Sequence, residues 1–426
     1  MADSQQRAEL HRPDQENASV PAFRLEPEVH DLLRPVPSTE LPVLQPSEGP
    51  GLPDAVYPCQ PDRIMTRKEY HRHQAGRTAR TWGAPFAKSL WHRGELRPII
   101  SYLFTEYACN LDCHYCWSYD NAAPGMTEAV ARRSIDWMEG TGCRVLALMG
   151  GEPLLRTDFM HKVVYYAAKK GFFVYIATNG RRLKPEVTDR LGDAGLSAIN
   201  LAIDTVKFRP ELPKSLDKIR SYFDYMVENQ HRYGYLMLLN MNITRINMDD
   251  VKELTEIARD NGIGTDYHIN ESPLMSQDHF KHLDENSTYL TPDDWPRVDA
   301  LLDYLADKHR AGYKMPNPAN HFPVMKRFMR GEEVSWTCRA GQNSLIVRCD
   351  GSLAPCFPMY GSTYDWGTVG NHKFEVSQLD EMKQSCNKRC LSTLNYILGH
   401  CYSVRRVLVW TLKQTLRGYK GASGSL

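Results

Sequence analysis

Three cysteines, Cys109, Cys113 and Cys116, lie close together in the segment 106–117. Thiols at this spacing can meet at one metal centre only if the backbone wraps around it, so we expect an exposed loop here. A short apolar run at 97–105, with Pro98 near its start, predicts a strand that leads into this loop.

Three thiolates are fewer ligands than most closed metal sites use. A structural zinc ion or a plain electron-transfer cluster usually has four protein ligands, whereas a cubane held by three cysteines leaves one iron open to a small molecule. The alternative is a zinc knuckle with His114 as fourth ligand, but His114 lies directly beside Cys113 and would have to bend back onto the same ion. The spacing therefore favours a centre that performs chemistry.

The cysteine spacing, with the aromatic Tyr115 just before Cys116, resembles that of the radical S-adenosylmethionine (SAM) enzymes. Further landmarks follow in that family's order: a predicted strand at 143–149 leads into Gly150, Gly151, Glu152 and Pro153, and a predicted strand at 173–178 leads into Asn179. The resemblance implies that these residues and Tyr115 contribute to the SAM site. It also implies that the backbone of the Gly-Gly-Glu-Pro motif pairs with the amino group of the SAM methionine.

The composition suits a large domain with a smaller one, or a single elaborated barrel. The chain has 426 residues, 42% of them hydrophobic, and a net charge of +1 that gives no reason to expect a nucleic-acid partner. No stretch approaches the ~20 apolar residues of a membrane span. Eleven cysteines could form disulfides, but the first residues lack the apolar region of a secretion signal; we therefore expect a cytoplasmic protein, in which cysteines are more typical of metal ligands or catalytic groups.

Two segments precede the barrel. Residues 1–62 contain eleven prolines among Glu, Ser and Gln, which predicts a largely disordered extension. Residues 63–97 are basic with interspersed aromatic residues, and here we expect a solvated helical lead-in. Contact with an anionic substrate or a membrane surface is the alternative.

Strands and helices alternate from residue 98 to about residue 271. Beyond the three strands above, we expect strands at 198–204, 235–244 and 265–269, and helices at 126–139, 158–170, 184–194, 215–233 and 249–261. Strands separated by helices imply parallel pairing with right-handed crossovers. These six units resemble the α/β partial (β/α)6 barrel, of the TIM type, of the radical SAM family, here residues 98–285, with the ligand at the C-terminal ends of the strands.

Polar residues follow the predicted strand ends. Asp204 closes the fourth strand, and Asn242 and Thr244 close the fifth, where the family binds the ribose hydroxyls and the methionine carboxylate of SAM. Asp204 could instead cap a turn, and the other two could merely satisfy their neighbours. Asn247, just before a predicted helix, is more typical of an N-cap than of a ligand.

His268, Asn270 and Glu271 leave the sixth strand and are candidate substrate contacts. Residues 268 and 270 share one face of the strand, so both could point into the barrel mouth. A histidine that is hydrogen-bonded in the barrel wall is the alternative. Residues 286–330 are expected to form a bridge out of the barrel, with a helix at 291–309 that Thr291 and Pro292 begin.

A second cysteine group follows in residues 331–404, around a predicted hairpin at Asp350 and Gly351. It resembles the auxiliary-cluster extension of radical SAM enzymes called the SPASM or twitch domain. The resemblance and the number of thiols favour one auxiliary [4Fe–4S] cluster with Cys338, Cys356, Cys386 and Cys390 as ligands, or with Cys401 in place of one of them. Cys143 and Cys349 are expected bystanders. Four thiolates also suit zinc, which is the alternative.

The tail at 405–426 is basic and amphipathic, with leucines every four residues beside Trp410. Packing against the barrel is the expected role, and a peripheral membrane contact that would suit a lipid-like substrate is the alternative.

The resemblance implies an enzyme that cleaves SAM with one electron from a [4Fe–4S] cluster. The resulting 5′-deoxyadenosyl radical takes hydrogen from a substrate C–H bond. An external electron donor such as flavodoxin or ferredoxin is then required. No leader-peptide module is evident, so we favour a small-molecule or lipid-like substrate over maturation of a peptide. A non-enzymatic iron–sulfur or zinc protein is the alternative from another class, and the Gly-Gly-Glu-Pro motif counts against it.

Overall fold

The computed structural model describes residues 50–54, 64–92, 95–116, 120–269, 287–361, 364–386 and 390–401. Several expectations lie outside these ranges: nearly all of the extension at 1–62, the tail at 405–426, and the candidate substrate residues Asn270 and Glu271. Within the described ranges, every helix is too short or too polar to cross a lipid bilayer.

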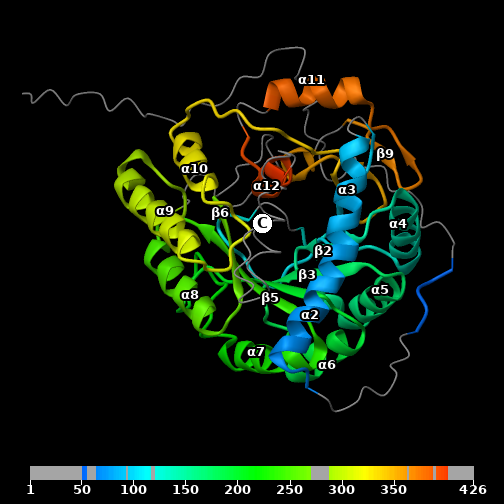
Figure 1. Ribbon diagram of the computed structural model, residues 1–426, viewed down its shortest axis with the longest axis horizontal. Helices are drawn as coiled ribbons and strands as arrows, with labels where there is room; N and C mark the ends of the chain where they lie inside the picture. Colours follow the sequence, from blue (N-terminus) through cyan, green and yellow to red (C-terminus); the bar gives the residue numbers. More distant parts are fainter. Residues whose placement is uncertain are drawn as a thin grey trace, which may run out of the picture.

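Six parallel strands form the centre of the fold. They are β1 (Ile100–Glu106), β2 (Val145–Gly150), β3 (Phe173–Thr178), β4 (Ala198–Ala202), β5 (Leu236–Ile243) and β6 (Gly264–Ile269). Each strand pairs in parallel with the next one along the chain. The sheet curves into an open barrel with helices around its outer side (Figure 1), so the predicted α/β fold with a partial barrel is confirmed.

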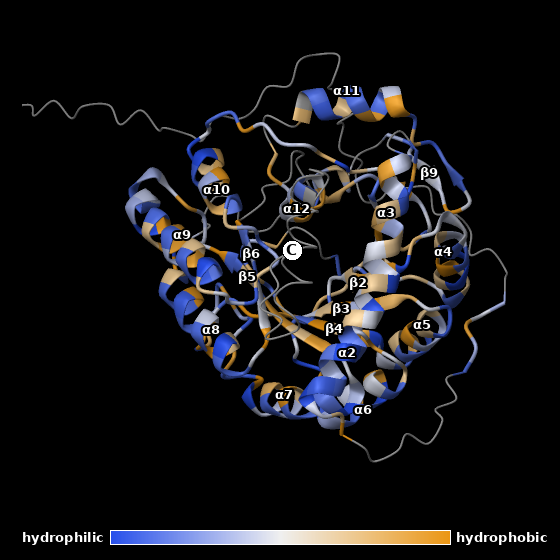
Figure 2. Cartoon of the chain, viewed as in Figure 1, coloured by the Kyte–Doolittle hydropathy of each residue, from blue (hydrophilic) through white to orange (hydrophobic). Residues whose placement is uncertain are grey.

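Amphipathic helices connect these strands and cover the outer face of the sheet. They are α4 (Glu128–Thr141), α5 (Thr157–Lys169), α6 (Pro185–Asp193), α7 (Arg220–Tyr233) and α8 (Met248–Asp260), and a short 3-10 turn, η3 (Pro153–Arg156), precedes α5. Helix α4 shows why the boundaries were readable from sequence: Thr127 caps its first turn by accepting from Val130 N–H (3.2 Å), and Gly142, at φ +85°, ends it. Figure 2 shows hydrophobic strands enclosed by helices with hydrophilic outer sides.

The N-terminal helices cross the end of the barrel where the strands begin. Helix α2 (Arg67–Thr78) continues through a π-helical turn, η2 (Ala79–Gly83), into α3 (Ala84–Trp91), and the run passes over the strands in Figure 1. Arg77 Nη2 donates to the carbonyl of Ser197 (3.0 Å), just before β4, and to that of Gly234 (2.7 Å), before β5. The predicted lead-in is therefore helical, but α2 is tied to the barrel and is not simply solvated.

The second cysteine region extends the main sheet. After α9 (Trp295–Arg310) and α10 (His321–Met329), strand β7 (Ser344–Val347) pairs in parallel with β1, and β8 (Leu353–Ala354) returns antiparallel to β7. The predicted hairpin exists, and it adds two strands to the barrel sheet, whose order is β6-β5-β4-β3-β2-β1-β7-β8. The short strands β9 (Gly367–Thr368) and β10 (Asn371–His372) follow, then helices α11 (Val376–Cys386) and α12 (Thr393–Cys401).

The predicted bridge helix at 291–309 is present as α9, preceded by a 3-10 turn, η4 (Pro292–Asp294). The Thr291 N–H and hydroxyl both donate to Asp294 Oδ2, at 2.9 and 3.0 Å. This reciprocal cap accounts for the sharp helix start that the sequence indicates.

Candidate functional site

The three cysteines lie on an irregular segment directly after β1, as expected of a loop. The backbone N–H of Cys109 donates to Asn121 Oδ1 (2.9 Å), and a turn brings Cys116 N–H to the carbonyl of Cys113 (2.9 Å). Cys113 is buried, whereas Cys109 and Cys116 are partly exposed. Burial raises the pKa of Cys109 to about 11 and that of Cys113 well above its usual value; nearby Cys116 adds to the rise at both, and Cys109 adds to the rise at Cys113. The three groups are therefore near enough to interact.

The glycine pair of the Gly-Gly-Glu-Pro motif packs against the backbone that leads into this loop. Gly150 has φ +147°, and a Cβ there would lie 2.0 Å from the carbonyl oxygen of Glu106. A Cβ on Gly151 would lie 2.3 Å from that of Ala108. In the same place Gly151 N–H donates to Glu106 O and Glu152 N–H to Ala108 O, both at 2.8 Å. Only glycines permit this approach, which joins the end of β2 to the cysteine loop.

Glu152 is completely buried and ties the end of β2 to the end of β3. Its Oε1 accepts from the Leu154 N–H (3.0 Å) and the Thr178 hydroxyl (2.7 Å), and its Oε2 accepts from the Asn179 N–H (2.8 Å). Burial raises the pKa of Glu152, and the hydrogen bonds oppose that shift. Asn179 in turn donates from Nδ2 to Asn110 Oδ1 in the cysteine loop (2.8 Å). Thus both neighbouring strands hold the loop.

Tyr115, Asp204 and Lys214 form a polar chain beside the cysteines, in which Tyr115 and Asp204 are buried and Lys214 is partly exposed. The Tyr115 hydroxyl donates to Asp204 Oδ2 (2.5 Å) and accepts from Lys214 Nζ (3.0 Å). Burial raises the pKa of Asp204, and the nearby Lys214 counteracts the shift. Burial opposes the charge on Lys214, but Tyr115, Cys113 and Asp204 outweigh burial and raise its pKa well above the usual value. Lys214 is therefore a cation held next to the thiols.

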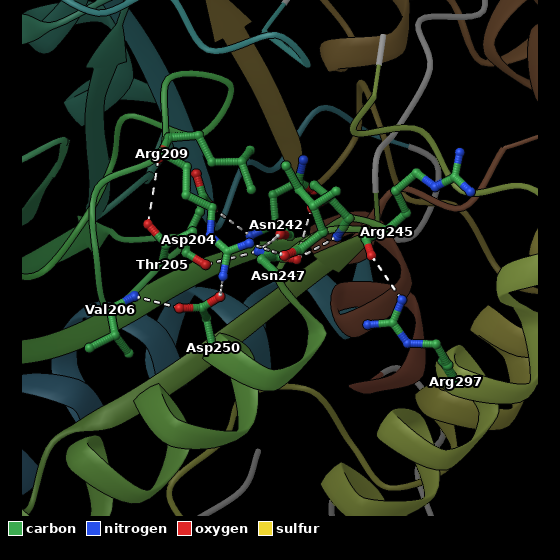
Figure 3. A network of polar contacts seen from close by, with 12 residues as sticks. Asp204, Thr205, Val206, Arg209, Asn242, Arg245, Asn247, Asp250 and Arg297 are labelled. Carbon is green, nitrogen blue, oxygen red and sulfur yellow. Dashed lines mark hydrogen bonds and ion pairs between the residues drawn. The ribbon is translucent and has the colours of Figure 1, made fainter.

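Asp204 also connects the ends of β4 and β5 (Figure 3). Its Oδ1 accepts from the Asn242 N–H at 3.0 Å. Asn247 Nδ2 donates to the carbonyls of Asp204 and Asn242, both at 2.9 Å, and Asn247 Oδ1 accepts from the N–H and hydroxyl of Thr244. Asn247 stands at the N-cap position of α8, as expected, but its side chain makes no capping bond to that helix. The Thr244 hydroxyl donates to Asn247 Oδ1, which fits the alternative in which Thr244 only hydrogen-bonds to neighbouring residues.

The remaining polar contacts of this region stabilise the loop after β4. Asp250, at the start of α8, accepts from the Val206 N–H (2.9 Å) and pairs with Arg209 (2.8 Å). Arg297 donates to the carbonyl of Arg245. The two contacts of Asp250 therefore hold the loop in which Lys214 lies.

His268 lies on β6, directly opposite Asn242 in the register of β5 and β6. Its Nε2 is 3.1 Å from Asn240 Nδ2 and 3.2 Å from Asp266 Oδ2, and its side chain is 27% exposed. The histidine is therefore hydrogen-bonded within the barrel wall while part of its ring stays accessible. The other two predicted substrate residues, Asn270 and Glu271, lie outside the described ranges.

In the second cysteine group, Cys338 and Cys386 are neighbours. Burial raises the pKa of both thiols, and with the negative charge of Cys338 nearby that of Cys386 reaches about 12. Lys383 lies beside them, almost fully buried, and donates to Gln342 Oε1 (2.9 Å). Cys356 is buried just before the 3-10 turn η5 (Phe357–Met359), and the Cys390 carbonyl accepts from Trp336 Nε1 (2.9 Å).

The remaining cysteines occupy other places. The Cys349 thiol donates to the carbonyl of Phe104 (3.0 Å), and Cys143, just before β2, lies 3.4 Å from the Ser101 hydroxyl. Cys401 ends α12, and its side chain is outside the described set. Among the side chains that are described, no three of the types His, Cys, Asp or Glu are grouped so as to hold a single metal ion. A cubane binds each cysteine through a different iron, so its ligands need not meet at one point.

Two contributors to the site were missed at the sequence level, Lys214 and Asn110. Asn110 lies inside the cysteine motif, between Cys109 and Cys113, and Lys214 belongs to no motif. The signal for Lys214 was the length of the connection between β4 and α7, which at 203–219 is long for a strand–helix loop and lies at the C-terminal edge of the barrel. Arg181 holds that loop by donating to the carbonyl of Pro213 (2.9 Å).

Comparison with known proteins agrees with this geometry. Residues 105–285 match the model of the Radical SAM superfamily. The GTP 3′,8-cyclase of Chlorobaculum tepidum is 30% identical over 243 residues, which cover 52% of this chain and 69% of the cyclase. The AdoMet-dependent heme synthase of Methanosarcina barkeri is 22% identical over 258 residues, covering 58% and 70%.

A solved structure with a similar fold is that of Streptococcus suis SuiB bound to S-adenosylmethionine. It has a TM-score of 0.51 and 15% identity, and the match covers 77% of this chain and 74% of SuiB. From the family match, the related cyclase and the shared fold, this chain belongs to the radical SAM superfamily.

Proposed function

We propose that Cys109, Cys113 and Cys116 hold the [4Fe–4S] cluster of a radical SAM enzyme, and that its substrate is a small molecule or lipid-like compound. The observation that carries this proposal is the anchoring of the cysteine loop. The ends of β2 and β3 both bind it, through Gly151 and Asn179. A loop fixed at the C-terminal edge of a barrel is where this architecture places its chemistry.

The residues of this loop fit such a cluster. The three thiols lie on one short loop, and the ammonium of Lys214 offsets part of the negative charge that three thiolates would concentrate there. When bound, the cluster supplies the single electron that splits SAM and yields the radical that abstracts hydrogen. The tasks of the chain are to orient SAM and substrate and to exclude water and oxygen.

SAM would lie along the strand ends, between the motif of β2 and the polar residues after β4 and β5. The backbone of Gly150, Gly151, Glu152 and Pro153 would meet its amino group. Asp204 would accept from the ribose hydroxyls, because each carboxylate oxygen can accept a second hydrogen bond besides those from Tyr115 and Asn242. Thr244 is the weakest candidate, since its hydroxyl already donates to Asn247.

The small-molecule branch is supported by the related cyclase, which is named for a nucleotide substrate. The likeness to SuiB concerns the fold alone, so maturation of a peptide stays the second candidate. An electron donor such as flavodoxin or ferredoxin would supply the reducing equivalent.

We also propose an auxiliary [4Fe–4S] cluster in residues 331–404. Its candidate ligands are Cys338, Cys356, Cys386 and Cys390, with Cys401 as the substitute for one of them. The mutual influence of Cys338 and Cys386 supports the pairing of these two, and buried Lys383 would counter their negative charge. We propose residues 98–285 as the barrel and 286–330 as the bridge to this region, although β7 makes the last two strands part of the same sheet.

The experiment is anaerobic reconstitution with iron and sulfide, followed by dithionite and SAM. A radical SAM enzyme forms 5′-deoxyadenosine; a filled cluster that forms none would refute the proposal. A Cys109→Ala, Cys113→Ala, Cys116→Ala variant tests the cluster assignment. The wild type is expected to bind about eight irons per chain and the variant about four, because only the auxiliary cubane remains. A variant that keeps all its iron would contradict the assignment of the first three cysteines.

A further inference from the structure

Strands β5 and β6 carry polar side chains on the face that points away from the helices. On β6, Thr265, Tyr267 and Ile269 are buried, and the Tyr267 hydroxyl contacts Thr255 on α8 (2.7 Å). Because side chains alternate along a strand, Asp266 and His268 lie on the opposite, inner face. Asn240 on β5 is the register partner of Asp266, so these three side chains share one surface inside the barrel.

Some acceptor atoms on this inner surface have no hydrogen-bond donor among the described residues. His268 Nε2 is 3.2 Å from Asp266 Oδ2 and 3.1 Å from Asn240 Nδ2, and one nitrogen cannot donate to the first and accept from the second at once. Asp266 Oδ1 is buried and has no partner among the residues that the structure describes. The same holds, within that set, for Asn200 Oδ1 on β4. Inner faces of parallel strands are usually apolar, so these polar groups call for a ligand or another polar partner.

The unfilled groups specify the chemistry of that partner. Both orphaned atoms are oxygen acceptors, and one belongs to a carboxylate. In the described part of the chain, His268 is the basic side chain that lies within ion-pair distance of Asp266, at 3.2 Å. An N–H donor that carries a positive charge would make the strongest hydrogen bond to such a carboxylate.

The group of Asp266, His268 and Asn240 also lies toward the C-terminal ends of the strands, the end that carries the cysteine loop. His268 pairs in register with Asn242, whose N–H donates to Asp204, and Asp204 accepts from Tyr115 beside Cys116. Neighbouring strands are about 4.8 Å apart, so His268 is roughly 10 Å from Asp204 across the sheet. A molecule anchored at Asp266 and His268 can therefore extend toward the cysteine loop.

We propose that Asp266, His268 and Asn240 form a substrate-anchoring subsite that binds a protonated amine. The inference rests on the proposed function, since it takes the barrel interior to be the substrate site of a radical SAM enzyme. It narrows the substrate to compounds with an ammonium or similar N–H cation at a distance from the reacting C–H bond.

The test uses the full-length, reconstituted and oxidised protein with ¹⁵N-labelled histidine. The ring signal of His268 is identified by its loss in His268→Gln. The protein is titrated with n-butylammonium chloride, and in separate arms with sodium n-butyrate and n-butanol, at constant ionic strength. We expect a saturable shift of the His268 signal with n-butylammonium alone.

In Asp266→Asn, n-butylammonium should bind about tenfold more weakly or worse, the loss expected when a charge-assisted hydrogen bond is removed. Asp266→Glu should keep the preference for the cation. The matched control is Asp303→Asn, because Asp303 is a carboxylate on α9 that is paired with Lys326 and well exposed; this variant should behave as the wild type.

Equal binding of butyrate or butanol, an unsaturable shift, or unchanged binding in Asp266→Asn would overturn the inference. If Asp266→Asn does not fold, the comparison of the three probes on the wild type still decides. The same preparation is assayed for 5′-deoxyadenosine with dithionite and SAM. Cleavage of SAM without binding of the cation defeats this inference alone, whereas a filled cluster without cleavage defeats the proposed function.

Discussion

Replacing Glu152 by glutamine tests whether the carboxylate of the Gly-Gly-Glu-Pro motif serves the fold. The carboxylate is fully buried and faces three donors, from Leu154, Thr178 and Asn179. If the amide oxygen of glutamine takes the place of Oε1, its NH₂ group faces the Asn179 N–H, donor against donor. In the other orientation two hydrogen bonds are lost.

The magnitude follows from these contacts. A hydrogen bond to a charged group contributes about 1.5–3 kcal/mol, and a buried donor left without a partner costs about 1–3 kcal/mol. We therefore expect Glu152→Gln to lower the free energy of unfolding by about 2–4 kcal/mol. The control is Glu139→Gln, which removes an ion pair with Lys170 (2.6 Å) at a side chain that is 34% exposed, and should cost at most about 1 kcal/mol.

Two measurements check this prediction. Urea unfolding of the metal-free protein gives the change in stability. Hydrogen exchange followed by mass spectrometry should show faster exchange at the amides of Leu154 and Asn179 in Glu152→Gln, and no change there in Glu139→Gln. If Glu152→Gln unfolds at the same urea concentration as the wild type and these amides stay protected, the carboxylate does not hold the strand ends and the reasoning fails.

Three further predictions concern charge, acidity and backbone space. Lys214→Gln should make the reconstituted cluster harder to reduce, by on the order of 60 mV for a tenfold change in the one-electron equilibrium, while Lys214→Arg should not. A redox titration followed by electron paramagnetic resonance measures the reduction potential. Equal potentials in the wild type and both variants would exclude an electrostatic role of Lys214. Burial of Glu256 opposes its ionisation, but hydrogen bonds from neighbouring groups prevail and lower its pKa from 4.5 to about 2. The stability that ionised Glu256 contributes is therefore present above pH 4.5 and lost as the pH falls toward 2. Over that range the unfolding midpoint of Glu256→Gln should change less with pH than that of the wild type. Gly150→Ala places a Cβ 2.0 Å from Glu106 O at φ +147° and should prevent iron uptake by the loop of Cys109, Cys113 and Cys116, whereas Gly140→Ala, in open space on α4, should leave iron uptake normal and stabilise the protein by about 0.5–1 kcal/mol.

The fold was largely readable from the sequence because its signals are local. Apolar runs of strand length alternate with amphipathic segments that begin at capping residues and end at glycines. Helix α8 was expected at 249–261 and is found at Met248–Asp260. The cysteine loop was recognised in the same way, because the spacing of the three thiols excludes a regular element.

What the sequence did not reveal depends on contacts between distant segments. Asn247 has the local features of a helix cap, but burial places it where three carbonyl and amide partners compete for its side chain. For Lys214 the sequence offered only the length of its loop, and the role of the residue appears when that loop folds against Tyr115. Strand β7 was expected in a separate region, yet its pairing with β1 joins segments more than two hundred residues apart.

The contacts of α2 bear on how the barrel can be trimmed. Gln74, Arg77 and Tyr70 satisfy the carbonyls of Ser197, Gly234 and Tyr235 where β4 and β5 begin. A shortened protein beginning at residue 98 would keep every cysteine of both groups and the C-terminal ends of the strands. It would lose α2, which covers the other end of the barrel, where the strands begin. Such a fragment should bind iron poorly because the carbonyls where β4 and β5 begin would lose these hydrogen bonds. Its inactivity would therefore not test the role of any residue in the reaction.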